Sequence, residues 1–276
     1  MGKFKTSNGF TLLELLTVSA IVVILTAIAI PVVHKVKQNG EMTRELSGAK
    51  KLIAGYLAYA VDHDGEVMVG YHNSAVAVDQ DGAALKFPIN ARYPWRVAPY
   101  LNYEFAGSVL VNQMVKLLSQ PGWEYAVSAE PSFGLNVTYV GGDFGSGSEL
   151  NPDSRMGKAV GDFVVTRLVE AVAPSKLLVF SSARQGSGIG EALPGNFMIR
   201  APNLMQPRWE DGPYNKGLHP QKFGFVDFRY QGQAVCAMLD GHVEMLGVDE
   251  LRDMRRWSNQ AADVNNPNHI LSRNEP

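Results

Sequence analysis

A single carboxylate, Glu14, interrupts a predominantly apolar run that extends from Phe10 to Val33. On translocon-based scales, the free energy of inserting an acidic side chain at the centre of a membrane helix is about +3 kcal/mol. A position nearer the end of the run costs less. An ionisable side chain in such a segment indicates a function by default. Glu14 is therefore the first candidate functional residue.

The run is long enough to cross a membrane. At about 1.5 Å per residue, a helix over 10–33 is about 36 Å long, and a hydrocarbon core is about 30 Å thick. The preceding leader has Lys3 and Lys5 and no acid, which predicts a cytoplasmic N-terminus with everything after Val33 across the membrane. Two alternatives are a secretory signal, whose apolar core is usually only about 7–15 residues, and a plain uncleaved anchor in which Glu14 has no role.

A second set of candidate residues lies near the C-terminus. Asp240, His242 and Glu244 alternate, so one strand would place them on one face, and all three are metal-ligand types. The favoured alternative is that Asp240 shapes a turn while His242 and Glu244 face solvent. We therefore predict no cofactor.

Two short acidic motifs leave calcium as an open alternative. Asp62-x-Asp64-Gly65 and Asp79-x-Asp81-Gly82 resemble the start of a calcium loop, but neither has the later acidic ligand that an EF-hand needs. Turns explain both motifs better.

Composition excludes several function classes. The net charge is −2 and the sequence pI is about 6.3, so no basic field for nucleic acid is predicted. Cys236 is the only cysteine, which rules out an intrachain disulfide, and its place in an alternating strand predicts a small buried hydrophobe. No Ser/His/Asp set suggests an enzyme.

A helical pattern continues beyond the apolar run. Apolar residues recur at spacings of three and four, which predicts one stripe of an amphipathic helix; they are Leu46, Ala49, Ile53, Tyr56, Leu57 and Ala60. Charged residues, Glu45 among them, are assigned to the other faces. The helix is expected to end at Asp62–Gly65, with an interruption near Asn39–Gly40 and a kink or unwound stretch at Ala27–Pro31.

The remaining elements read as a mixed α+β domain. We expect helices over 93–101 and 108–118, strands over 132–140 and 176–180, and long loops over 141–153 and 203–222. The clearest signal is 233–246, where Asp240-Gly241 between alternating apolar residues predicts a hairpin with a two-residue turn, both residues taking positive φ.

The N-terminal residues resemble a known signal. The basic leader followed by Gly9, Phe10 and the sequence through Glu14 is similar to the class III signal of type IV prepilins and type II secretion pseudopilins. The resemblance implies that a prepilin peptidase cuts between Gly9 and Phe10 and methylates the new amine. Glu14 is then the fifth residue after the cut, and Pro31 matches the family's proline. Glu14 of a neighbouring subunit would neutralise that amine, because a paired membrane charge costs much less than an isolated one.

The C-terminal region resembles a module of large pseudopilin-like proteins, in which a His and nine further residues precede Asp-Gly. Asp240-Gly241 matches, but Tyr230 occupies the His position, which puts any role of that His in doubt. We expect Tyr230 in or near the strand that leads into the turn.

The resemblance implies a type IV pilin-like α+β fold: a long N-terminal helix, transmembrane in its first half, packed on an antiparallel sheet with large loop insertions. The expected segments are a leader (1–9), a transmembrane helix (10–33), its amphipathic continuation (34–64) and a periplasmic or extracellular domain (65–276).

The implied function is that of a non-enzymatic subunit of a type II secretion pseudopilus or related filament. Its partners would be the prepilin peptidase, other pilin or pseudopilin subunits, an inner-membrane platform protein, an assembly ATPase and membrane lipid. It would reside in the inner membrane as a single-pass protein, and after assembly in a periplasmic or surface filament. A surface type IV pilin for adhesion, motility or DNA uptake, and a binding module or enzyme with a prepilin-type anchor, remain alternatives.

Overall fold

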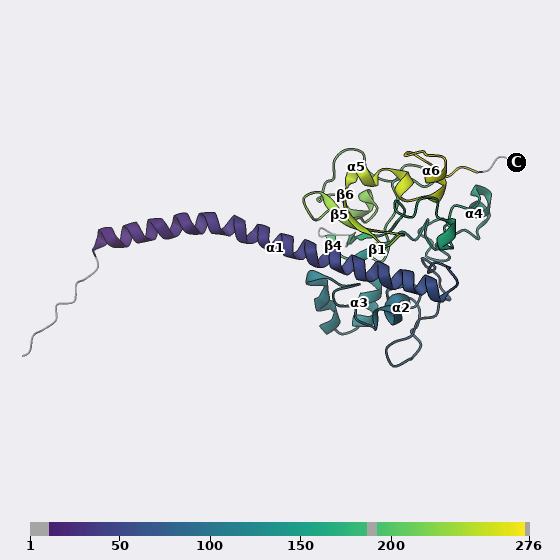
Figure 1. Cartoon of the computed structure of the whole chain (residues 1–276), viewed down its shortest axis with the longest axis horizontal. Helices are drawn as coiled ribbons and strands as arrows, with labels where there is room; N and C mark the ends of the chain where they lie inside the picture. The colour runs from purple at the N-terminus through teal and green to yellow at the C-terminus, as the bar shows by residue number, and fades with distance from the viewer. Residues whose placement is uncertain (1–10, 187–191, 274–276) are drawn as a thin grey trace, which may run out of the picture. The chain divides into compact units, whose positions relative to one another are not determined.

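The computed structural model describes residues 11–186 and 192–273. Contacts divide the chain into two units, Met1–Glu41 and Met42–Pro276. Helix α1, Leu12–Asp62, contributes to both (Figure 1). Gly9 and Phe10 lie outside the described residues.

Helix α1 is continuous over its 51 residues. The expected interruption at Asn39–Gly40 and the unwound stretch at Ala27–Pro31 are therefore wrong, and the helix ends at Asp62 rather than at 64. A glycine inside a helix costs only about 1 kcal/mol, and Pro31 removes one backbone donor while the hydrogen bonds on either side remain.

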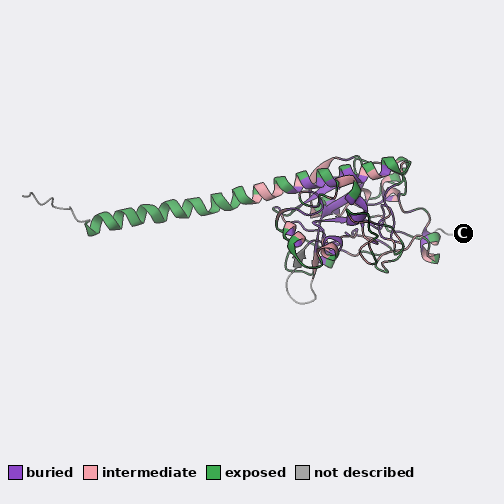
Figure 2. Ribbon diagram, turned by 90° about the horizontal axis from the view of Figure 1, so that it is seen from below, coloured by how far each residue is buried: buried purple, intermediate pink, exposed green. Residues whose placement is uncertain are grey.

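The first unit exposes its apolar side chains along the whole described stretch from Leu12 to Val33 (Figure 2). By length and composition α1 could cross a membrane, with a mean hydropathy of 2.7 in its most apolar window. Its threonine hydroxyls donate to backbone carbonyls of the same helix, Thr17 to Glu14 O at 3.0 Å and Thr26 to Val22 O at 2.7 Å. Such internal bonds satisfy polar groups in the hydrocarbon core of a membrane, where water is absent.

The second unit is built on a four-stranded antiparallel sheet in the order β1-β2-β5-β6. These strands are Phe133–Leu135, Leu178–Ser182, Gln233–Met238 and Val243–Gly247. This sheet and the long helix confirm the predicted α+β, type IV pilin-like architecture.

The second half of α1 packs on one face of the sheet. Tyr56 meets the Phe180 ring edge-on at a centroid distance of 5.4 Å. Gly48 and Gly55 allow close approach, because an added Cβ would lie 2.5 Å from Val111 Cγ1 and 2.8 Å from Leu101 Cδ2 respectively. The two glycines thus have a packing reason that the helical pattern alone did not reveal.

The other face of the sheet is covered by the C-terminal segments. Cys236 and Met238 share a buried cluster with Trp257, whereas Val235 and Ala237 belong to the cluster of Tyr56. Cys236 is a buried thiol whose pKa burial raises to about 12, so it behaves as a small hydrophobe.

Several predicted elements differ from those observed. The strand expected over 132–140 ends at Leu135, and a turn follows in which Val140 N donates to Asn136 O. The Asn136 side chain donates to Leu178 O and Trp257 O. The helix expected over 108–118 is a 3₁₀ helix, η2, Asn112–Ser119. The strand expected over 176–180 begins at Leu178, after a turn on Ala173 O.

Short elements fill the rest of the second unit. They are α2 (Tyr93–Val97), η1 (Ala98–Leu101), α3 (Trp123–Ala129), α4 (Arg155–Val160), η3 (Leu168–Glu170), β3 (Arg184–Gly186), β4 (Ala192–Pro194), η4 (Pro220–Phe223), α5 (Val248–Leu251), η5 (Met254–Arg256) and α6 (Asn259–Asp263). Helices α2 and η1 match the expectation for 93–101, and α3 was not predicted.

Candidate assembly site

Glu14 caps the first turn of α1 together with Thr11. The Glu14 carboxylate accepts from Thr11 N at 2.9 Å and from Thr11 Oγ1 at 2.7 Å, and Glu14 N donates back to Thr11 Oγ1 at 3.2 Å. This reciprocal arrangement is a capping box, and a carboxylate at a helix N-terminus also complements the helix dipole. Both side-chain bonds reach Oε2, so Oε1 can accept a further donor.

The hairpin turn between β5 and β6 has three residues rather than two. Met238 N donates to His242 O and Gly241 N to Met238 O, each at 2.9 Å. Among the two expected turn residues only Gly241 has a positive φ, at 88°; Asp240 does not, which corrects that expectation. The loop is a turn closed by a glycine bulge, a common solution for three-residue hairpins.

This turn contacts the second half of α1. Lys50 Nζ donates to Gly241 O at 2.6 Å, and a Cβ on Gly241 would lie 3.0 Å from Leu57 Cδ1. The hairpin therefore ties the sheet to α1 at two points of the helix.

Of the alternating residues, His242 bonds to Asp240 and Glu244 bonds to Arg256. His242 Nδ1 lies 2.6 Å from Asp240 Oδ1, and Arg256 Nη1 donates to Glu244 Oε1 at 2.8 Å. Partial burial raises the pKa of Asp240, but the hydrogen bonds from His242 and the charges of His242 and Lys50 outweigh it, so the pKa falls below its ordinary value. Within 11–186 and 192–273, no group of three acidic, His or Cys side chains is arranged to hold a metal.

A buried carboxylate, Glu45, joins α1 to the sheet. Glu45 is completely buried, which corrects its assignment to an exposed face of the helix. Its carboxylate accepts from Ser182 Oγ at 2.5 Å and from Tyr230 Oη at 2.6 Å. A buried carboxylate needs such partners, because desolvation of an unpaired charge is costly.

Arg229 supplies the counter-charge to Glu45. Its Nη1 lies 3.5 Å from Glu45 Oε2, its Nε lies 3.1 Å from Asp227 Oδ2, and its Nη2 donates to Ala183 O at 2.7 Å. Burial lowers the pKa of Arg229, but the Glu45 and Asp227 carboxylates outweigh burial and raise it overall. The result is a buried network that spans α1, β2 and the segment before β5.

Parts of the chain are similar to known proteins. Residues 4–30 match the family described as "Prokaryotic N-terminal methylation motif". The type IV major fimbrial protein FimA of Dichelobacter nodosus is 25% identical over 143 residues, covering 46% of this chain and 92% of the relative. The N-terminal segment thus carries a prepilin-type methylation motif, and the chain is similar to a type IV pilin subunit. No solved structure gives a significant match.

Tyr230 has a structural role that its sequence position did not reveal. Tyr230 forms a bridge with Gln233 directly before β5, and its hydroxyl reaches Glu45 on α1. A Tyr at this position thus serves as a donor to the buried carboxylate. The burial of Glu45 could have been predicted from the sequence, because Glu45 precedes Ala49, Leu52 and Ile53 at the spacing of the buried stripe.

A second buried ion pair fixes the Gly/Ser/Asp-rich loop over 141–153. The Glu149 carboxylate contacts Arg200 Nε at 2.7 Å, Arg208 Nη1 at 2.6 Å and Thr138 Oγ1 at 2.6 Å. Glu149 therefore holds this loop against the expected loop over 203–222, whose last residues form the start of η4.

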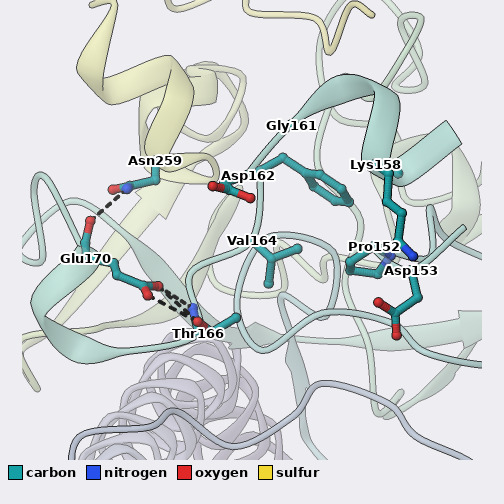
Figure 3. Close-up of a pocket in the computed structure, with 11 residues that line it drawn as sticks. Pro152, Asp153, Lys158, Gly161, Asp162, Val164, Thr166, Glu170 and Asn259 are labelled. Atoms are coloured by element: carbon teal, nitrogen blue, oxygen red, sulfur yellow. Dashed lines mark hydrogen bonds between the residues drawn. The ribbon is translucent and has the colours of Figure 1, made fainter. Parts of the chain in front are cut away.

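A pocket of about 640 Å³ lies beside α4 and η3 (Figure 3). Two of its polar side chains are used in local structure: the Glu170 carboxylate accepts from Thr166 N at 2.8 Å and Arg167 N at 3.0 Å, and Asn259 Nδ2 donates to Glu170 O at 2.7 Å. These bonds fix the turn at η3, so we assign the pocket no chemistry.

We predict that Gly241→Val destabilises the second unit more than Gly232→Val does. Both glycines have positive φ, 88° and 83°, so both variants carry a backbone strain of about 1–3 kcal/mol. Only the Gly241 variant also crowds a neighbour, Leu57, whereas an added Cβ at Gly232 meets nothing within 4 Å. Urea denaturation of both variants of the detergent-solubilised chain measures the difference, and equal losses would contradict the contact with α1.

Proposed function

We propose that the chain is a structural subunit of a type II secretion pseudopilus or a related type IV pilus-like filament. The observation that carries the proposal is the prepilin-type methylation motif at 4–30, which contains the single acid of the apolar run. The pilin relative and the long helix packed on an antiparallel sheet support it. The work of such a subunit is assembly rather than catalysis.

In this proposal a prepilin peptidase removes residues 1–9 between Gly9 and Phe10 and methylates the new amine. Residues 10–33 span the inner membrane, the helix continues beyond them to Asp62, and 65–276 form the periplasmic or extracellular domain. The single-pass orientation follows from Lys3 and Lys5 in the leader.

Assembly then proceeds through the apolar segment. The amine at Phe10 of one subunit pairs with Glu14 of its neighbour, and Pro31, which lacks a backbone donor, would be the point at which the helix extends during assembly. An inner-membrane platform protein and a cytoplasmic ATPase act as partners, and membrane lipid surrounds the subunit before extraction.

A surface type IV pilus is the second candidate. The relative from Dichelobacter nodosus is named a major fimbrial protein, which favours an extended fibre. Deletion of the gene separates the two: loss of secretion of folded proteins supports the pseudopilus, and loss of surface fibres with normal secretion supports the pilus.

We predict that Glu14→Ala impairs filament assembly at least tenfold while it eases membrane insertion, because it removes the docking charge and a membrane carboxylate together. The matched control is Glu41→Ala, which removes an acid of the same helix beyond the apolar run. Filament yield is measured by immunoblot of sheared fractions. A normal yield from Glu14→Ala would mean that Glu14 is not the docking charge.

We further propose that the chain works without a metal. Chelation is therefore expected to leave the melting temperature of the full chain unchanged, and His242→Ala to have little effect, because His242 is a partly exposed partner of Asp240. A fall in melting temperature on chelation that His242→Ala abolishes would instead establish a metal site at the hairpin.

A further inference from the structure

A group of basic residues follows the apolar run directly. His34, Lys35 and Lys37 come immediately after Val33, and the next acid in the sequence is Glu41. All three side chains are exposed, and α1 continues through them without a break. They therefore lie at a fixed height on the helix, within about one turn of the last apolar residue of the run.

The directions of these side chains favour a planar surface over a protein partner. At about 100° per residue, Lys35 and Lys37 point about 160° apart around the helix axis, so a partner docked on one face of the helix would meet only one of them. A membrane surface surrounds a crossing helix and meets both. Long lysine stems also let the ammonium groups reach the headgroup level while the stem stays along apolar surface.

Acidic side chains of the same chain compete only weakly for the two lysine ammonium groups. Lys37 Nζ lies 4.0 Å from Glu41 Oε1, with 73% of the lysine side chain exposed, and an exposed pair of this kind contributes little. Within the described ranges, Lys35 makes no ion pair. Both ammonium groups are thus available to an external anion.

We propose that Lys35 and Lys37 bind the headgroups of anionic phospholipids at the membrane surface where the apolar segment ends. The proposal rests on the membrane anchoring in the proposed function. Before assembly, this contact would set the depth of the subunit in the bilayer, because moving the helix along the membrane normal would pull the lysines away from the headgroup phosphates.

The test uses the full chain reconstituted in bilayers of phosphatidylglycerol and phosphatidylcholine. Spin-labelled lipids report the relative association of each headgroup with the protein. We expect the wild-type chain to prefer phosphatidylglycerol, the double variant Lys35→Gln/Lys37→Gln to lose at least threefold of that preference, and the wild-type preference to fall with added salt. The control is Lys51→Gln/Lys116→Gln, which removes the same charge from exposed positions in the second unit.

Each outcome decides the proposal. A wild-type chain without preference, or a double variant that retains it, would overturn the headgroup site while leaving the anchoring intact. An equal loss in the control variant would assign the effect to net charge and also overturn the site. A chain that alkaline carbonate washes from the vesicles would overturn the anchoring, and the headgroup site with it.

Discussion

Gly9→Val is expected to leave the chain uncut and to abolish filament formation. A branched side chain does not fit a cleavage site that takes glycine, so the leader with Lys3 and Lys5 stays attached. The amine at Phe10 then never forms, and Glu14 of a neighbouring subunit has no counter-charge to meet. The intact mass of the membrane-extracted chain, measured from cells with an active prepilin peptidase, reports the cut.

Gly40→Val is the matched control for this variant. It introduces the same side chain into α1, at a position where an added Cβ meets nothing within 4 Å. It should be cut and assembled as the wild-type chain is. If Gly9→Val were processed normally, the assignment of the cleavage site would fail.

Glu45→Ala is expected to destabilise the second unit by about 3–5 kcal/mol, the usual cost of breaking a buried ion pair by removal of one partner. The variant leaves Arg229 buried with Asp227 alone, and it removes the acceptor for the hydroxyls of Ser182 and Tyr230. Urea denaturation of the detergent-solubilised chain, followed by tryptophan fluorescence, measures the loss.

Glu41→Ala serves as the control for Glu45→Ala because it removes an acid one turn earlier on the same helix. The Glu41 side chain is 36% exposed and its pair with Lys37 is a surface one, so its loss should cost about 1 kcal/mol or less. Similar small losses for both variants would show that the buried network does not hold α1 to the sheet.

The sequence predicted the parts of the fold that repeat a local pattern. The long helix, the hairpin and the elements at 93–101 follow from the spacing of apolar residues and from turn residues, and all are present. The turn at Asp240-Gly241 was placed correctly along the chain but given the wrong length, because Asp-Gly fits both a two-residue turn and a glycine bulge.

The parts that could not be predicted depend on contacts between distant residues. Glu45 looks like a surface acid until Ser182, Arg229 and Tyr230 are brought to it from segments more than a hundred residues away. Directly after strand β1, the Asn136 side chain donates to Leu178 O and Trp257 O, far along the chain. Such partners arise from the tertiary fold, and local propensity carries no signal for them.

The most direct measurement is mass spectrometry of filaments sheared or extracted from cells that express the chain. A filament subunit should be present in them as a processed chain that begins at an N-methylated Phe10. Recovery of the chain only from the membrane fraction, with residues 1–9 still attached, would contradict a role in filament assembly.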